Sequence, residues 1–350
     1  MDVAAADPYA VAPGSARSLR TIWLLATLLL TVGPLVLAVS LAPSIHSSPP
    51  TALVWLLFVG SSVHVGATAW FYTVADVRTH MRGHPWRYYW IPLALVVVTA
   101  MIAAIASTEA MTWVLSGYFA WQFFHFQKQN LGISALAARS LGAARLTGIE
   151  RAALTVAGIG GVGWLVAHPA LLQIDRHGVF DSWLHPALQA VAACGAGAFV
   201  SAVLVGATAA VRRPRSDRPA MFLIIYGTSL AFFLPAFLFE SPYAAVAGLT
   251  IAHGMQYLLL VGLIAGAPTE TVPAQVGVLI CLNIAVVLGL VLNQASHLHS
   301  GTSGLDRWLF GGYLGAVMAH FVIDAGLWRL RDEFPRAFLT RRLPYLLAPQ

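Results

Sequence analysis

Four histidines lie inside long apolar segments of the sequence, where an imidazole can bind a metal or carry a proton. They are His64, His125, His253 and His320, and each belongs to a different apolar segment. Ionisable side chains at membrane depth are costly, so they usually face internal partners and mark a function. Imidazole is a good ligand for iron, copper, zinc and nickel. These four residues are therefore the candidate metal ligands.

Other polar side chains accompany the four histidines at helical spacings, and residues three or four apart share one face of a helix. The pairs are Gln122 and Gln129 with His125, Gln256 and Tyr257 with His253, Thr68 with His64, and Asp324 with His320. A metal-bound imidazole usually donates its other N–H to such a neighbour, which fixes the tautomer of the ring.

These six neighbours therefore receive two kinds of predicted role. Three are expected to support the bound cofactor, namely Gln122, Gln129 and Thr68. Three are expected to orient the ligands or move protons in a reaction, namely Asp324, Tyr257 and Gln256. Asp324 is alternatively a ligand itself, because a carboxylate also binds metals.

The composition places these residues in a membrane. The chain has 350 residues, of which 58% are hydrophobic and 10% are charged, and its mean hydropathy is +0.74. A soluble domain carries about 25% charged residues, and a spanning helix needs about 20 mostly apolar ones. We predict an all-α, polytopic integral membrane helix bundle of about ten transmembrane helices. Their expected ranges are Thr21–Leu41, Thr51–Val74, Tyr89–Ile105, Ala110–Phe126, Ala152–Ala167, Ser182–Val211, Ala220–Phe239, Tyr243–Ala265, Ala274–Leu292 and Trp308–Leu327.

The distribution of basic residues predicts the orientation. With ten helices and a cytoplasmic N-terminus, all of the 20 Lys and Arg except Arg176 and Arg307 fall on the cytoplasmic side, as the positive-inside rule requires. Both termini are thus expected in the cytoplasm, and the membrane is expected to be a bacterial-type inner (plasma) membrane. The four histidine-bearing helices then run in the same direction. Their histidines lie roughly 15–22 Å from the outer edge of a hydrocarbon core that is ~30 Å thick.

The domain organisation follows from the same pattern. We expect a disordered cytoplasmic tail over residues 1–16, a single transmembrane domain over residues 17–335 and a cytoplasmic C-terminal tail over residues 336–350. The net charge of +6 is explained by loops on one side of the bilayer, so no nucleic-acid partner is expected. The glycines Gly158, Gly160, Gly161 and Gly163 sit inside an apolar helix and predict close helix packing.

The ligand types limit the cofactor. The two cysteines lie in apolar runs, which disfavours iron–sulfur and thiolate sites. Two options remain, a haem held by a histidine pair or a non-haem iron held by three or four histidines, with copper as the alternative metal. One histidine per helix at one depth favours a single centre. The predicted function is a membrane oxidoreductase or oxygenase acting on an apolar, lipid-soluble small molecule, with the lipid bilayer and a redox partner protein as its partners.

Two short pieces of the chain resemble the membrane β-carotene dioxygenases. His320-Phe-Val-Ile-Asp324 is similar to a His-x3-Asp element near the C-terminus of that family, and His64-Val-Gly-Ala is similar to an early His-Phe-Gly element. The early Pro-His-Gly-Ala-x-Asp element of the family is missing here, and the helix count differs. The resemblance implies an iron site.

Two other classes of protein fit the same residues. The polar side chains could form the proton or solute pathway of a membrane transporter, or the chain could be a structural or assembly subunit. In the second case each histidine is a hydrogen-bonded packing residue between helices. Lys128, near the inner end of its helix, is placed to meet an anionic head group. The choice between a metal centre, a transport pathway and a structural subunit depends on whether the four histidine-bearing helices are neighbours in space.

Overall fold

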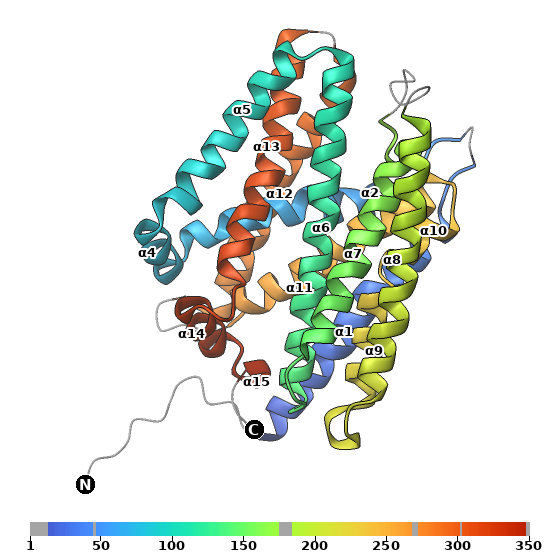
Figure 1. The fold of residues 1–350 in the computed structure, drawn as a ribbon. Helices are drawn as coiled ribbons and strands as arrows, with labels where there is room; N and C mark the ends of the chain where they lie inside the picture. The colour runs from blue at the N-terminus through green and yellow to red at the C-terminus, as the bar shows by residue number, and fades with distance from the viewer. Residues whose placement is uncertain (1–12, 45–46, 175–183, 268–271, 302, 348–350) are drawn as a thin grey trace.

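The fold consists of long helices that run side by side (Figure 1). A computed structural model describes residues 13–44, 47–174, 184–267, 272–301 and 303–347, and these residues form helices and turns without any strand. Eight helices are long and apolar enough to cross a membrane. The all-helical, multi-pass character expected from the sequence is therefore confirmed. The eight spans are Gly14–Ser40, Thr51–Thr73, Trp86–Ile105, Gly148–Ala167, His185–Val211, Tyr243–Ala265, Ala274–His299 and Gly304–Leu327.

Two of the ten expected helices are outside this set of eight. The segment Ala110–Phe126 is part of α6 (Thr108–Ser140), whose 33 residues extend to about 50 Å and include Glu109, Lys128 and several amides. The segment Ala220–Phe239 is divided into α9 (Ala220–Leu230) and α10 (Leu234–Leu238), with Pro235 in the first turn of α10. The count of ten and the cytoplasmic placement of the termini remain predictions.

The helices form two flanks around a central pair. α5 (Ile91–Ile105) packs along α13 (Gly304–Leu327) on one flank, and α7 (Gly148–Ala167) packs along α8 (His185–Val211) on the other. Between them lie α6 and α11 (Gly248–Ala265), and α11 also packs on α1 (Pro13–Ser40).

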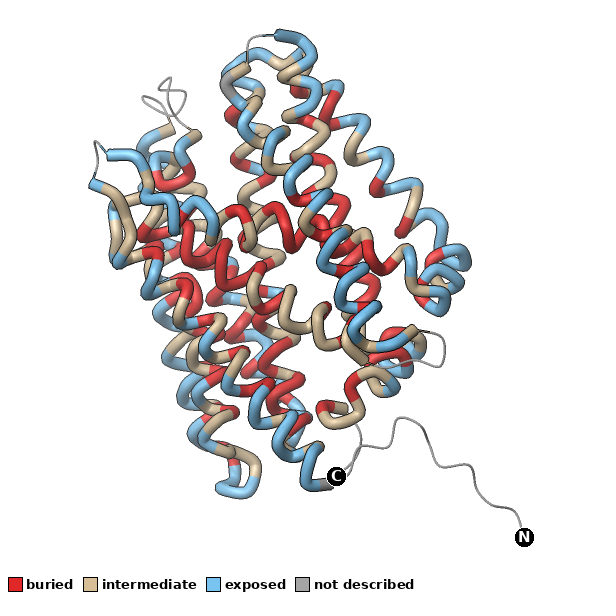
Figure 2. Tube along the Cα trace, turned by 180° about the vertical axis from the view of Figure 1, so that it is seen from behind, coloured by how far each residue is buried: buried red, intermediate tan, exposed pale blue. Residues whose placement is uncertain are grey.

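Burial follows this arrangement, with buried residues in the middle of the bundle and exposed residues outside (Figure 2). In the span that contains α11, 67% of the most apolar stretch of 18 residues is buried, whereas the corresponding share in α8 is 22%. α11 is thus the central helix of the bundle, and α12 (Ala274–Ser296) and α3 (His64–Ala67) pack against each other beside it.

The glycines of α7 allow close helix contacts, as predicted. A Cβ on Gly160 would lie 2.6 Å from the carbonyl oxygen of Gly195 on α8, and one on Gly161 would lie 2.3 Å from the ring of Phe233. A Cβ on Gly158 would lie 2.4 Å from the side chain of Gln127 on α6. These glycines let α7 approach α8 and α6 closely, which confirms the packing role predicted for them.

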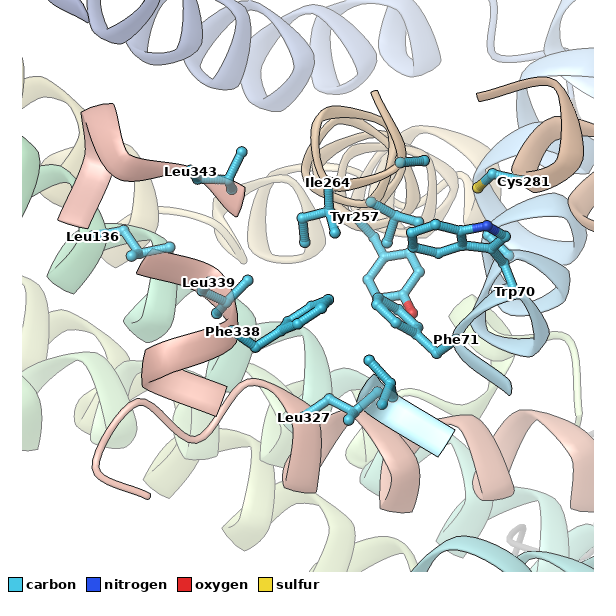
Figure 3. Close-up of a cluster of buried hydrophobic side chains, with 14 of the residues drawn as sticks. Trp70, Phe71, Leu136, Tyr257, Ile264, Cys281, Leu327, Phe338, Leu339 and Leu343 are labelled. Atoms are coloured by element: carbon cyan, nitrogen blue, oxygen red, sulfur yellow. The ribbon is translucent and has the colours of Figure 1, made fainter. Parts of the chain in front are cut away.

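The chain ends differ in how far the structure describes them. Residues 1–12 of the predicted N-terminal tail lie outside the described residues, and α1 begins at Pro13. The segment predicted as a C-terminal tail, residues 336–350, includes most of α14 (Glu333–Arg342) and all of α15 (Pro344–Leu347). Phe338, Leu339 and Leu343 are buried in the same cluster as Ile264 of α11 (Figure 3). This segment is therefore packed against the bundle as far as residue 347.

A buried ion pair joins α7, α8 and the segment that precedes α7. Nε and Nη2 of Arg213 lie 2.6 Å from the two carboxylate oxygens of Glu150, and this bonding raises the pKa of Arg213. Arg213 also donates to the carbonyl oxygens of Ala144 and Arg145. Glu150 and Thr147 form a capping box at the start of α7. The side chain of Glu150 is 0% exposed and that of Arg213 is 5% exposed, so neither charge has access to water if the other is removed.

We expect the substitution Arg213→Met to lower the free energy of unfolding by about 3–5 kcal/mol, because it leaves the Glu150 carboxylate buried without its partner. Thermal unfolding of the purified protein in detergent measures this effect. The exposed neighbour provides a control, and Arg212→Met should change stability by less than about 0.5 kcal/mol. Equal losses in the two variants would contradict the assigned role of the ion pair.

Candidate metal centre

The four candidate histidines converge on one place in the bundle. The ring centroid of His64 lies 5.0 Å from that of His253 and 5.1 Å from that of His320. The ring of His125 lies 5.0 Å from His253 and 5.3 Å from His320. They come from α3, α6, α11 and α13, so the four helices predicted to carry one histidine each are neighbours around one point.

The ring nitrogens of this cluster are buried, and most have no partner. His64, His253 and His320 are 4%, 0% and 2% exposed, and the side chain of His125 is 12% exposed. Among the described residues, both nitrogens of His64, both of His253, and Nε2 of His125 and of His320 lack a hydrogen-bond partner. The backbone of Gly60 and Ser61 lies beside the His64 ring, outside hydrogen-bond geometry. Buried polar atoms are nearly always paired, so six unpaired nitrogens in one cluster require an explanation.

The spacing of these atoms allows them to share a ligand. Ring nitrogens of His64, His253 and His320 lie within 4.8 Å of one another, and the same limit holds for His125, His320 and a carboxylate oxygen of Asp324. His320 belongs to both groups. Phenyl rings cover the outer faces of two imidazoles, with Phe126 stacked on His253 and Phe321 stacked on His125.

An irregular helix places His64. The span Thr51–Thr73 begins as α2 (Thr51–Leu57), widens into the π-helix η1 (Phe58–Val63), returns to α3 at His64, and tightens into the 3₁₀-helix η2 (Thr68–Thr73). Single π-helical turns are frequent at functional sites. Here the π-turn ends directly before His64.

Two glycines bring η1 and α11 into backbone contact beside the site. A Cβ on Gly254 would lie 2.0 Å from the carbonyl oxygen of Gly60, and a Cβ on Gly60 would lie 2.5 Å from Cα of Ile251. Only glycine at both positions allows this approach. Since Gly254 follows His253 directly and Gly60 precedes His64 by one turn, the contact also sets the separation of the two imidazoles.

Three of the six polar neighbours predicted from the sequence, Thr68, Tyr257 and Asp324, form a hydrogen-bonded chain around His320. Oγ1 of Thr68 lies 2.6 Å from Nδ1 of His320 and 2.8 Å from the hydroxyl of Tyr257. The Tyr257 hydroxyl also donates to Oδ1 of Asp324 at 3.1 Å. Thr68 thus contacts His320 across the helix interface, although its spacing in the sequence associated it with His64. Tyr257 lies among the buried side chains Trp70 and Phe71 in Figure 3.

Asp324 lies close to two of the imidazoles. Its Oδ2 atom lies 3.6 Å from Nε2 of His320 and 4.0 Å from Nε2 of His125. Because Thr68 engages Nδ1 of His320, Nε2 is the ring atom of His320 that remains available for another ligand. The carboxylate is 2% exposed as a residue and faces the histidines.

The predicted glutamines form a separate amide network. Nε2 of Gln129 donates to the carbonyl oxygen of His253 and to Oε1 of Gln256, at 2.9 and 2.8 Å. Nε2 of Gln256 donates to Thr31 of α1 at 2.7 Å and to Asn130 at 3.4 Å. These bonds connect α6, α11 and α1 and hold the backbone of His253, so their described contacts are to the frame of the site and not to the imidazole rings. Gln122 has a buried Oε1 without a partner.

Several structural residues near and beyond the site were missed in the sequence. Glu150 and Arg213 belong to charged stretches where nothing distinguishes a buried pair from solvated residues. Gly60 and Gly254 are isolated glycines in apolar segments, and their importance depends on which helices meet. The π-turn before His64 has no sequence signature. The polar residues at helical spacing were the signal that could be read.

The comparisons with known proteins give no relative of this chain. No protein-family model, no curated protein and no solved structure matches it.

We expect Gly254→Ala to destabilise the protein by about 1–3 kcal/mol, because the new methyl group would overpack the contact with Gly60 and force α11 away from η1. Gly262→Ala on the same helix is the control, since its Cβ would meet nothing within 4 Å. That variant should be neutral or stabilised by up to about 1 kcal/mol, as Ala is the better helix former. Thermal unfolding in detergent compares the two, and equal midpoints would show that the glycine contact is not tight.

Proposed function

We propose that the chain is an integral membrane oxidoreductase in which His64, His125, His253 and His320 hold a metal ion inside the bilayer. Its substrate would be an apolar small molecule dissolved in the membrane, and electrons would come from a redox partner protein. The proposed location is the inner membrane of a bacterial-type cell.

The observation that carries the proposal is the set of six unpaired nitrogens on four converging imidazoles. If the histidines served only helix packing, they would be expected to donate and accept hydrogen bonds across the interface. Leaving a buried polar group unpaired costs about 1–3 kcal/mol. A metal ion at the centre of the cluster would bind one nitrogen of each imidazole as a ligand and remove that cost for the nitrogens it binds.

The donor set fits a late first-row metal. Imidazole suits iron, copper and zinc, and one carboxylate beside the imidazoles is common in non-haem iron sites. Ligand nitrogens of one ion lie about 2.1 Å from it, and so at most about 4.2 Å apart. The ligand atoms of His64, His253 and His320 lie within 4.8 Å of one another, as do those of His125, His320 and Asp324, so side-chain rotations within each group would bring them to ligand distance. Four rings packed this closely favour a single ion over a haem, whose macrocycle needs a flat space between its axial ligands.

The protein side chains divide the remaining tasks. Thr68 holds Nδ1 of His320, which directs Nε2 toward the centre. Asp324 lies beside His125 and His320, where it can complete the ligand set or accept a proton through its contact with Tyr257. A bound iron or copper ion would supply one-electron chemistry to a substrate that arrives from the bilayer. The apolar walls formed by Phe126 and Phe321 exclude water from this place.

The proton pathway of a transporter is the alternative suggested by the chain Thr68–Tyr257–Asp324. A pathway of that kind must reach both surfaces of the membrane. The described hydrogen bonds of these residues return to His320 instead, which favours a closed site. A structural or assembly subunit would leave the unpaired nitrogens without an explanation.

We expect the purified wild-type protein to contain close to one equivalent of iron or copper, with an absorption band of the bound metal. Each of the substitutions His64→Ala, His125→Ala, His253→Ala and His320→Ala should remove the metal or weaken its binding strongly. Thr68→Val, which removes the hydrogen bond to His320, should lower metal affinity about 10- to 100-fold. Elemental analysis and absorption spectroscopy measure both effects.

The double variant His80→Ala/His84→Ala is the matched control, because these two histidines form a close pair outside the cluster. It should retain the metal and the spectrum. A metal-free, colourless wild type that keeps its cellular activity would refute the metal centre. Proton uptake into liposomes by that metal-free protein would favour the transporter, and a copurifying partner with tolerant histidines would favour the assembly subunit.

A further inference from the structure

We propose that the substrate is a single-chain amphiphile with a carboxylate head group, which reaches the centre from the bilayer between α6 and α13 and is bound there by Lys128. The inference rests on the proposed function for the reaction, but it concerns a binding surface that can be tested without turnover. We call this surface the α6–α13 seam and define it by Trp121, His125 and Lys128 of α6 and by Phe321 and Ala325 of α13.

The seam is where the histidine cluster approaches the outside of the bundle. The side chain of His125 is 12% exposed, whereas His64, His253 and His320 are exposed by 4% or less. A molecule that approaches through the lipid therefore meets the His125 edge of the cluster first. The other faces of the histidine cluster are covered by α3 and α11, which are buried within the bundle.

The outward face of α6 leads along this edge. Trp113, Gly117, Trp121 and Lys128 are exposed, and their spacing of four, four and seven residues keeps them on one face of the helix. His125 lies between Trp121 and Lys128, one turn from each. The path past the histidine therefore has an aromatic residue at one end and a cation at the other.

The contacts between α6 and α13 on one side of His125 favour an occupant with one hydrocarbon chain. On one side of His125, the rings of Trp121 and Phe321 lie 5.7 Å apart and bring α6 and α13 together. Phe321 also stacks on the His125 ring with centroids 4.5 Å apart. On the other side, the exposed residue of α13 is the small Ala325, next to Asp324. A glycerophospholipid with two chains needs more room than this pair of contacting helices provides.

Lys128 supplies the head-group contact. It is the only lysine in the sequence, it is exposed, and no ion pair joins it to a described carboxylate. Its ammonium group lies 5.7 Å from the ring centroid of Phe124, so the aliphatic part of the side chain follows the apolar surface of α6. An ammonium there attracts an anion that is dissolved in the membrane.

The distance between Lys128 and His125 limits which part of the amphiphile reaches the centre. Three helical residues separate them, or about 4.5 Å along the axis. A carboxylate at Lys128 therefore places carbons near the head group, rather than the far end of the chain, beside His125 and Asp324. The seam would select both a charged head group and a position of reaction close to it.

The test is photo-crosslinking in nanodiscs of phosphatidylcholine, with a palmitic acid analogue that carries a diazirine near its carboxylate. Labelled peptides identified by mass spectrometry should come from α6 and α13 around His125. Lys128→Met should reduce this labelling about fivefold, which corresponds to the ~1 kcal/mol that one basic side chain contributes at an anionic surface. Lys128→Arg should retain the labelling, and Arg151→Met, which removes an exposed cation on α7, should leave it unchanged.

Three outcomes would overturn the inference. They are labelling spread evenly over the bundle, equal labelling by the corresponding neutral alcohol analogue, and competition by phosphatidylglycerol as strong as that by unlabelled palmitate. Metal content measured on the same samples separates the two proposals. Head-group-dependent labelling of a metal-free wild type would refute the metal centre and support the binding surface. A metal-loaded protein without such labelling would refute the binding surface and support the metal centre.

Discussion

The backbone contact between Gly60 and Gly254 is the constraint on which the rest of the site depends. It brings a π-helical turn against the central helix α11, one residue from His253 and four residues from His64. With the two backbones held there, two imidazoles face each other at 5.0 Å. The histidines of α6 and α13 complete the cluster from the other side. A side chain at either glycine would push η1 away from α11 and move His64 away from His253.

Around this contact, two polar networks have different tasks. Thr68, Tyr257 and Asp324 surround His320 and determine which of its ring nitrogens is available. The amide network of Gln129 and Gln256 instead holds the backbone of α11 against α6 and α1. In a membrane every polar group must find an internal partner. The hydrogen-bonded amides of Gln129 and Gln256 therefore stabilise the bundle, whereas six imidazole nitrogens beside them have no hydrogen-bond partner and indicate a ligand. The ion pair of Glu150 and Arg213 lies near the end of α7 and stabilises the α7–α8 flank.

The sequence was sufficient for the fold class and for the candidate residues, for a physical reason. Apolar length reports a spanning helix directly, and a histidine inside such a segment is visible without any structure. The partner of Thr68 could not be inferred, because sequence spacing reports neighbours on one helix, and His320 belongs to another. The hydrogen-bond partners of Gln256 could not be inferred for a related reason. Its amide shares a helix face with His253, yet its bonds go to Thr31 and Gln129 of neighbouring helices. The division of Ala220–Phe239 into α9 and α10 depends on a turn before Pro235 that hydropathy does not register.

The asymmetry of the cluster connects its structure to the kind of ligand it can receive. Three imidazoles are enclosed by helices and can be reached only after the bundle has moved, whereas His125 has an edge at the α6–α13 seam. A centre closed on every side would suit a purely structural metal, and a centre open to water would suit a polar substrate. An arrangement in which a partly exposed His125 lies between Trp121 and Lys128 on one helix face suits neither of these. It suits a molecule that is already dissolved in the bilayer and whose charge keeps one end at the membrane surface, so that the surface itself orients the molecule before it reaches the histidines.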